Sequence, residues 1–148
     1  MSLIDNKKAH FNYEILERHE AGIELLGIEV KALRVKRASL EGSHVTVRGG
    51  EAYLVGMTIQ PYQPNNIPKD YDANRNRRLL LTKSEIAELA AHEDKKGLTI
   101  VPISVYSKGH KVKVEIAVAR NKKSHDKRET LKKREAERDI LRDIKSVR

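Results

Sequence analysis

The sequence has no cysteine and no tryptophan, one phenylalanine, five tyrosines and four prolines in 148 residues. The absence of cysteine excludes disulfide bonds, thiolate catalysis and cysteine-based zinc sites. No run of about 18 or more apolar residues occurs, so we expect no transmembrane helix and no membrane partner. The first residues lack the apolar stretch of a signal peptide. These absences favour a cytoplasmic protein.

Motifs of the common catalytic sites are missing as well. The six histidines, at positions 10, 19, 44, 92, 110 and 125, form no His-x-x-x-His or His-Glu-x-x-His pair, and we interpret His92 as solvated. No phosphate-binding glycine loop and no Gly-x-Ser-x-Gly occurs. We therefore expect no catalytic residues, no metal site and no cofactor. An enzyme acting on RNA remains an alternative, because a sequence cannot pair carboxylates across strands.

Positive charge is concentrated near the C-terminus. The chain has 30 Lys and Arg against 21 Asp and Glu, a net charge of +9. Residues 1–119 carry 18 basic and 15 acidic residues, whereas residues 120–148 carry 12 and 6 and contain no Gly, Pro or aromatic residue. This distribution predicts an anionic partner, most simply nucleic acid, and an appendage with its own function. A solvated tail is the alternative.

Alternating apolar residues predict several short strands. Residues 45–59 alternate on both sides of Gly49-Gly50, which is typical of a β-hairpin. Residues 12–20 and 98–106 also resemble strands, and Pro102 should lie at an edge or a bulge. In residues 111–119 four β-branched residues face one way, and Lys, Glu and Ala face the other.

Helices are predicted in two places. Thr82-Lys83-Ser84-Glu85 is a capping box, and the spacing that follows predicts a helix over residues 83–95. Helical spacing also begins near Glu29 and continues to Arg34, after a short strand over residues 23–26. Residues 60–76 contain three prolines and predict a long loop.

About six strands with short helices predict a mainly β fold, a small closed barrel of the oligonucleotide-binding type. A sheet-plus-helix α+β fold remains possible. We expect an RNA-binding barrel domain over residues 1–120 and a basic tail over residues 121–148.

Seven short motifs, in order along the chain, carry a resemblance to a known family. They are Asn6-Lys7-Lys8-Ala9, Tyr13-Glu14-Ile15, Glu20-Ala21-Gly22, Gly27-Ile28-Glu29-Val30-Lys31-Ala32-Leu33-Arg34, Arg77-Arg78-Leu79-Leu80-Leu81, Lys111-Val112-Lys113-Val114 and Lys122-Lys123-Ser124-His125-Asp126-Lys127-Arg128. The chain resembles the small protein B (SsrA-binding protein) family of bacterial trans-translation. It departs at Asn121, where the family usually has Gly, and at Ala32, where Ser is common. The loop at 62–74 shares little with the family.

The resemblance implies a non-enzymatic, monomeric adaptor with an oligonucleotide-binding barrel and a tail that is disordered when free. The barrel would bind the tRNA-like domain of transfer-messenger RNA. The tail would occupy the decoding centre and the empty mRNA channel of a stalled ribosome, against small-subunit rRNA. A general ribosomal-RNA-binding or ribosome-assembly protein with the same barrel and tail is the alternative.

The candidate RNA-binding residues of the barrel and its exit combine basic groups for phosphates with amides and carboxylates for sugars and base edges. They are Asn6, Lys7, Lys8, Glu20, Glu29, Lys31, Arg34, Leu80, Thr82, Arg120, Lys122 and Lys123. For Glu20 and Glu29 an ion pair that supports the fold is the alternative; Leu80 could equally belong to the core, and Thr82 could serve only as a helix cap. Few aromatic residues are available for stacking on single strands, which favours structured RNA.

The tail contains basic residues for rRNA phosphates and a thin apolar stripe. Its candidate ribosome-binding residues are His125, Asp126, Lys127, Arg128, Lys132, Lys133, Arg134, Ile140 and Ile144. The stripe is too thin to stabilise a free helix, so we expect the tail to become helical when bound.

Overall fold

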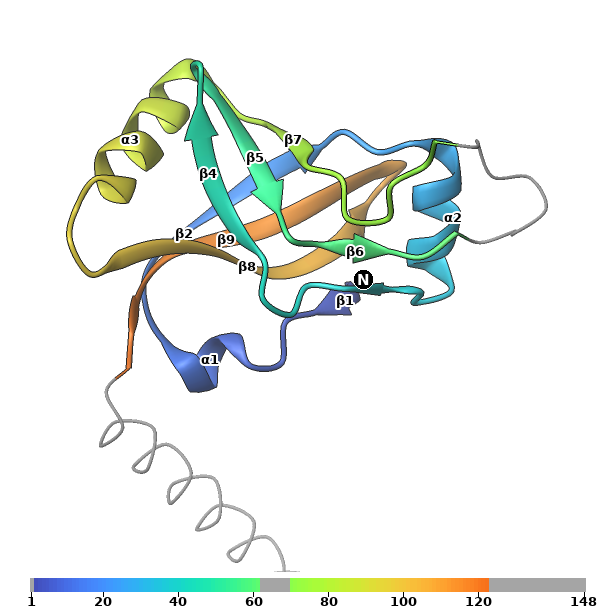
Figure 1. Ribbon diagram of the computed structural model, residues 1–148, viewed down its shortest axis with the longest axis horizontal. Helices are drawn as coiled ribbons and strands as arrows, with labels where there is room; N and C mark the ends of the chain where they lie inside the picture. Colours follow the sequence, from blue (N-terminus) through green and yellow to red (C-terminus); the bar gives the residue numbers. More distant parts are fainter. Residues whose placement is uncertain (1, 62–69, 123–148) are drawn as a thin grey trace, which may run out of the picture.

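The computed structural model describes residues 2–61 and 70–122, which form nine strands and three helices. The bounds are β1 (Ser2–Asp5), α1 (Ala9–Asn12), β2 (Tyr13–Ile23), α2 (Gly27–Arg34), β3 (Ala38–Ser39), β4 (His44–Arg48), β5 (Glu51–Val55), β6 (Thr58–Ile59), β7 (Arg77–Leu80), α3 (Lys83–Glu93), β8 (Leu98–Lys108) and β9 (Lys111–Asn121). The fold is mainly β, as predicted (Figure 1).

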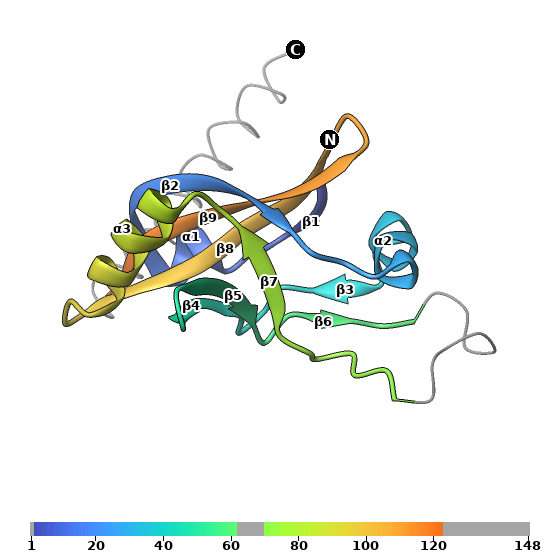
Figure 2. The same ribbon diagram turned by 90° about the horizontal axis from the view of Figure 1, so that it is seen from above.

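Seven strands form one antiparallel sheet in the order β1-β8-β9-β2-β7-β5-β4, and β3 pairs with β6 in a separate ribbon. The prediction of a closed barrel needs a correction in one respect. Within the described residues, hydrogen bonds do not close the sheet, and β1 and β4 remain its edges. The sheet curls strongly instead, so that β4 passes close to β8 (Figures 1 and 2).

The three long strands β2, β8 and β9 form the middle of the sheet. The predicted strand over 111–119 is confirmed as β9, and the predicted hairpin around Gly49-Gly50 is confirmed as β4 and β5. Pro102 lies next to a register shift between β8 and β9, so the expected bulge is present. The predicted short strand over 23–26 is wrong: β2 ends at Ile23, and the following residues lead into α2.

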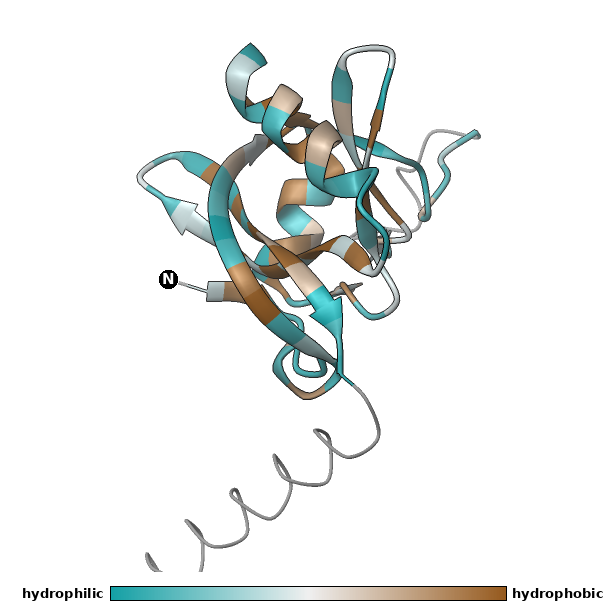
Figure 3. Ribbon diagram, turned by 90° about the vertical axis from the view of Figure 1, so that its left-hand side faces the viewer, coloured by the Kyte–Doolittle hydropathy of each residue, from teal (hydrophilic) through white to brown (hydrophobic). Residues whose placement is uncertain are grey.

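The apolar residues divide into one main core and one small cluster. Ile116 of β9, Leu33 of α2 and Leu89 of α3 belong to the main core inside the curled sheet. On the opposite face of the sheet, Ala9 of α1 covers a cluster that includes Ala117 and Ala119. The two faces of β9 therefore differ as predicted. The sequence did not predict α1, however, and this helix covers part of the face that carries Ala117 and Ala119. Figure 3 shows hydrophilic and hydrophobic residues alternating along the long strands.

The predicted capping box starts α3. The Thr82 hydroxyl accepts a hydrogen bond from the Glu85 amide at 3.2 Å, and Glu85 Oε1 accepts one from the Thr82 amide at 3.2 Å. At the other end of α3, the Glu93 carboxylate accepts hydrogen bonds from Thr46 Oγ1 and the Val47 amide of β4. Both ends of α3 are thus fixed by side chains. Among the described helices, none is long and apolar enough to cross a membrane.

Candidate nucleic-acid interface

A row of side chains crosses the outer face of the sheet from β7 to β8. Gly22 of β2 lies opposite Leu80 of β7 on one side and opposite Lys113 of β9 on the other. Lys113 in turn lies opposite Tyr106 of β8. Residues directly opposite each other in a sheet point to the same face, so these four positions form one continuous row.

Gly22 allows Leu80 to lie flat on this face. A Cβ atom at position 22 would lie 3.1 Å from the Leu80 Cβ, closer than side chains normally approach. The Leu80 side chain is 46% exposed, whereas its neighbour Leu79 is in the core. The alternative that Leu80 is a core residue is therefore wrong, and Leu80 is available for contact.

Glu20 lies on the same face, two residues before Gly22. Its carboxylate accepts hydrogen bonds from the Tyr106 hydroxyl and from Lys108 Nζ, the latter at 3.3 Å. The bond from Tyr106, followed by that from Lys108, holds the pKa of the Glu20 carboxyl below its usual value. Burial and the bond to Glu20 raise the pKa of the Tyr106 phenol to about 12. Glu20 is thus an exposed, ionised acceptor held in place by two neighbours.

Thr82 follows Leu80 closely along the chain, but its hydroxyl is already engaged. It accepts from the Glu85 amide and donates to Glu85 Oε1 at 2.8 Å. These bonds lower the pKa of the Glu85 carboxyl. In the structure Thr82 is therefore a helix cap, and its exposed side chain lies beside the row of Leu80.

Helix α2 presents two of the candidate basic residues to solvent. Lys31 and Arg34 are exposed and lie three residues apart, so they share one side of the helix. Neither binds a carboxylate among the described residues. Both cations are available to an external anion.

Glu29 of the same helix points the other way and is fully buried. Its carboxylate accepts hydrogen bonds from Arg77 Nη2 at 2.6 Å and from the Leu26 amide at 2.8 Å. Arg75 Nε and the Tyr71 hydroxyl donate to it at 3.1 Å and 3.2 Å. Burial by itself raises the pKa of the Glu29 carboxyl, but the bonds from Arg75, Leu26 and Arg77 outweigh it and leave the pKa below the usual value. The alternative interpretation of Glu29, an ion pair that supports the fold, describes this arrangement.

Arg77 is the centre of this network, and it was not a candidate residue in the sequence. All five of its N–H groups find acceptors: Glu29, and the backbone carbonyls of Met57, Ala73 and Arg75. The partners lie up to 48 residues away in the sequence. In the sequence, the one indication of this network was the basic cluster Arg75, Arg77 and Arg78 before the apolar run. That cluster did not show that Glu29 is the acceptor.

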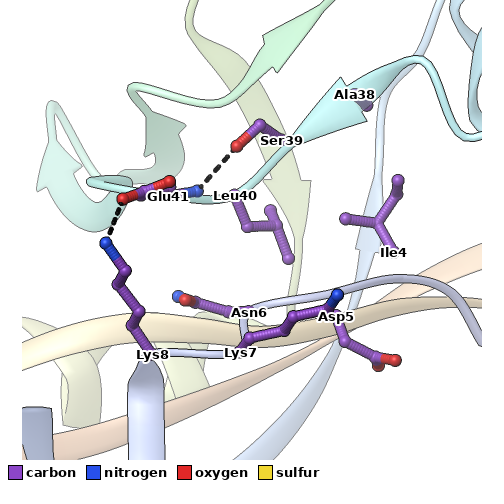
Figure 4. Close-up of a pocket in the computed structure, with 9 residues that line it drawn as sticks. All are labelled: Ile4, Asp5, Asn6, Lys7, Lys8, Ala38, Ser39, Leu40 and Glu41. Atoms are coloured by element: carbon purple, nitrogen blue, oxygen red, sulfur yellow. Dashed lines mark hydrogen bonds and ion pairs between the residues drawn. The ribbon is translucent and has the colours of Figure 1, made fainter. Parts of the chain in front are cut away.

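The segment Asn6, Lys7 and Lys8 joins β1 to α1 beside a small pocket of about 220 Å³ (Figure 4). The Asn6 side-chain amide donates to the Pro102 carbonyl at 2.9 Å, so its role here is to hold this segment against β8. Lys8 Nζ pairs with Glu41 Oε1 at 2.7 Å, and both side chains are largely exposed. Lys7 is exposed and binds no carboxylate among the described residues.

The end of β9 lies against α1. The Lys122 amide donates to the Asn12 carbonyl at 2.9 Å, and Lys122 Nζ donates to the His10 carbonyl at 2.8 Å. Arg120 is exposed and 3.9 Å from Glu14, a weak ion pair. Asn121 still belongs to β9, paired with Tyr13. The exit of the chain from the sheet is thus tied to α1 by backbone and side chain.

Asn6 and the basic candidate residues therefore form two groups rather than one surface. Asn6–Lys8, Arg120 and Lys122 gather around α1, whereas Lys31 and Arg34 lie on α2 at the other end of the molecule (Figures 1 and 2). Lys123 and all candidate tail residues, His125 to Ile144, lie outside the described residues, as does most of the loop at 62–74. The prediction that the tail becomes helical when bound also falls on these residues.

An open groove of about 660 Å³ extends the row of Leu80 toward α2. Leu26, just before α2, and Leu80 contribute exposed apolar surface to it, and Arg78, Asn76 and Tyr53 contribute polar groups and an aromatic ring. The sequence did not indicate this groove, because its lining comes from three separate segments, 23–26, Tyr53 and 75–80.

The fold and these surfaces define a class: small, basic, mainly β proteins with an exposed polar face suited to an anionic partner. Residues 3–146 match the model of the family described as SmpB protein, and the chain belongs to that family.

Relatives and a solved structure agree with this assignment. The chain is 48% identical over 143 residues to an SsrA-binding protein of Gloeothece citriformis, covering 97% of this chain and 92% of the relative. It is 49% identical over 142 residues to an SsrA-binding protein of Oleidesulfovibrio alaskensis, covering 96% and 91%. A chain of the solved structure "tmRNA-SmpB: a journey to the center of the bacterial ribosome" matches with a TM-score of 0.69 and 40% identity, over 82% of this chain and 85% of that one.

Proposed function

We propose that this protein is an RNA-binding adaptor of trans-translation that binds transfer-messenger RNA and brings it to stalled ribosomes. The observation that carries the proposal is the 40% identity, over 82% of the chain, to a protein solved in a tmRNA-SmpB structure. In this role the protein catalyses no reaction. It acts in the cytoplasm, where the ribosomes are.

The geometry supports contact with folded RNA. Lys31 and Arg34 offer two free cations for phosphates on one side of α2. Glu20, held ionised by Tyr106 and Lys108, is an acceptor for ribose hydroxyls or base amino groups. Leu80 and the groove beside it offer apolar surface for a sugar or an unstacked base.

Glu29 and Thr82 act indirectly in this proposal. The Glu29 carboxylate is satisfied by buried guanidinium groups, so it fixes the orientation of α2 and hence of Lys31 and Arg34. Thr82 starts α3 beside Leu80. Asn6 and Lys122 likewise hold the segments that display Lys7, Lys8 and Arg120.

The first test is to sequence the RNA that co-purifies with the protein from bacterial cells at moderate, controlled salt. Salt must be fixed because non-specific phosphate contacts weaken steeply as it rises. We expect one dominant RNA with a tRNA-like end and an internal reading frame. A broad mixture of ribosomal and messenger fragments would contradict the adaptor role and favour a general ribosomal-RNA-binding protein.

We further propose that residues 1–120 bind transfer-messenger RNA and residues 121–148 engage the ribosome. Deleting residues 126–148 should leave RNA affinity unchanged but abolish tagging of stalled products in a reconstituted translation system. A matched control replaces the same residues with a neutral Gly/Ser segment of equal length. A large loss of RNA affinity in the deletion would contradict this division.

A further inference from the structure

Two acidic and two histidine side chains meet between β2 and α3, away from the surfaces described above. Glu17 and His19 lie opposite Val118 and Ile116 of β9, both core residues, so their side chains point toward the inner face of the sheet. Glu88 and His92 lie four residues apart on α3, so they share one side of that helix. Helix α3 packs at this end of the sheet (Figure 1).

The ligand atoms of three of these residues are close together. One carboxylate oxygen of Glu17, one of Glu88 and an imidazole nitrogen of His19 all lie within 4.8 Å of one another. His92 Nε2 lies 3.0 Å from Glu17 Oε2, and His19 Nε2 lies 3.5 Å from Glu17 Oε1. The first distance is within the range of an ion pair or a hydrogen bond, whereas the second is too long for a hydrogen bond.

Both imidazoles have a buried nitrogen without a hydrogen-bond partner among the described residues, Nε2 in His19 and Nδ1 in His92. The His19 side chain is only 13% exposed. A buried polar atom without a partner is unfavourable, so such atoms call for an explanation, and a bound ion or water molecule is one of the few candidates. His19 Nε2 is also the nitrogen that lies 3.5 Å from the Glu17 carboxylate.

We propose that Glu17, His19 and Glu88 bind a divalent transition-metal ion such as Zn²⁺. Imidazole nitrogen and carboxylate oxygen are both Zn²⁺ ligands, at about 2.0–2.2 Å. The carboxylates must therefore move inward by about 1 Å, which two exposed glutamate side chains can do by changing rotamer. His92 does not coordinate; its Nε2, 3.0 Å from Glu17 Oε2, orients that carboxylate, as outer partners of metal ligands commonly do.

Such an ion would join β2 to α3, because two ligands come from the strand and one from the helix. It would also balance the charge of two exposed carboxylates that lie beside a mostly buried imidazole. The consequence is a metal-dependent attachment of the helix that Thr82 begins. This inference does not depend on RNA binding, so either proposal can fail without the other.

The test is to titrate the metal-free, full-length protein with ZnCl₂ by isothermal calorimetry and to follow thermal unfolding in parallel. We expect one equivalent of Zn²⁺ to bind and the midpoint of unfolding to rise with its concentration. H19Q and E88Q should abolish both effects, and H92Q should weaken binding by about tenfold. Glu88 is exposed, so E88Q should fold normally even if H19Q does not.

H110Q, at an exposed turn histidine, and E24Q, at an exposed glutamate, are the matched controls and should bind Zn²⁺ like the parent chain. Absence of binding in the parent chain would overturn the proposal, and the buried nitrogens would then be satisfied by water. Binding that survives H19Q and E88Q, or is lost with H125Q instead, would also overturn it, because the ion would sit elsewhere.

Discussion

The Glu29 carboxylate lies inside the protein between the guanidinium groups of Arg75 and Arg77. Burying an ion pair is expensive, and the pair is tolerated only when its remaining hydrogen-bonding groups are also satisfied. Arg77 meets that condition, since its N–H groups all have acceptors. This network fixes the chain between β6 and β7 against α2.

Glu29→Gln should therefore destabilise the protein by about 3 kcal/mol, because it leaves the buried Arg77 charge uncompensated. Equilibrium unfolding in urea measures the change. Glu24→Gln is the matched control: Glu24 pairs with Arg78 on the surface, where ion pairs contribute less than about 1 kcal/mol. Equal losses for the two variants would contradict the buried role of Glu29.

The same carboxylate predicts a pH dependence. Its pKa is lower in the folded protein than in the unfolded chain, so its stabilisation is fully present above the unfolded value, about 4.3. As the pH falls from there through the folded pKa, the stabilisation is lost. The difference in stability between the parent and Glu29→Gln should narrow over this acidic range. A difference that stays constant down to the lowest pH at which both fold would contradict this assignment.

Tyr106 offers a residue-scale test on the outer face. Glu20→Gln should lower the pKa of its phenol from about 12 toward the ordinary tyrosine value, because the neutral amide no longer favours the protonated phenol. Ultraviolet titration of the tyrosines measures this, and Tyr106→Phe identifies which transition belongs to Tyr106. If Glu20→Gln leaves the highest transition unchanged, Glu20 does not hold Tyr106.

Among the elements, α3 depends most clearly on side chains at its two ends. The capping box fixes its start, and Glu93 fixes its end to β4. Because the helix contributes Ile86 and Leu89 to the core, its position affects the stability of the whole sheet.

Thr82→Ala should cost about 1 kcal/mol of unfolding free energy, since it removes the acceptor of the Glu85 amide. Thr82→Ser keeps a hydroxyl at this position and should retain most of the stability. Chemical denaturation measures the free energy of unfolding of both variants and of the parent chain. If Thr82→Ala also reduces RNA affinity while Thr82→Ser does not, the cap matters for the neighbouring surface as well.

At the scale of the whole molecule, charge rather than shape predicts how tightly RNA is held. Each phosphate that a protein cation neutralises releases counterions, so RNA affinity falls as the salt concentration rises. The slope of log affinity against log salt is proportional to the number of phosphate contacts. In the described residues, Lys31 and Arg34 are exposed cations on α2, the helix that follows Leu26 of the groove, whereas Lys95 and Lys96 follow the far end of α3.

The double variant Lys31→Ala/Arg34→Ala should weaken binding of transfer-messenger RNA and reduce the slope of log affinity against log salt by about 1–2. Fluorescence anisotropy at several salt concentrations measures both. The control variant Lys95→Ala/Lys96→Ala removes the same amount of charge. It should change the RNA affinity and the salt slope much less. Equal effects of the two double variants would show that only net charge matters.

Local features of the chain were predictable because local physics decides them. The capping box at Thr82, the turn at Gly49-Gly50 and the alternation from Lys111 onward depend on residues close in sequence, and all three are confirmed. Neither β1 nor α1 was predicted from the sequence. Helix α1 is a single turn that forms only where Ala9 packs on Ala117 and Ala119, which are far away in the sequence.

Composition and sequence order by themselves determined the mainly β class, the separation of positive charge and the family. Tertiary structure alone decided which candidate residues face solvent. It buried Glu29 with Arg77, exposed Leu80 over Gly22, and brought Glu88 to His19 across 69 residues of chain. The physical reason is that burial and pairing depend on the register of strands and helices that are far apart in the sequence. The sequence alone does not show whether the partner of a polar side chain is water, an arginine or an RNA phosphate.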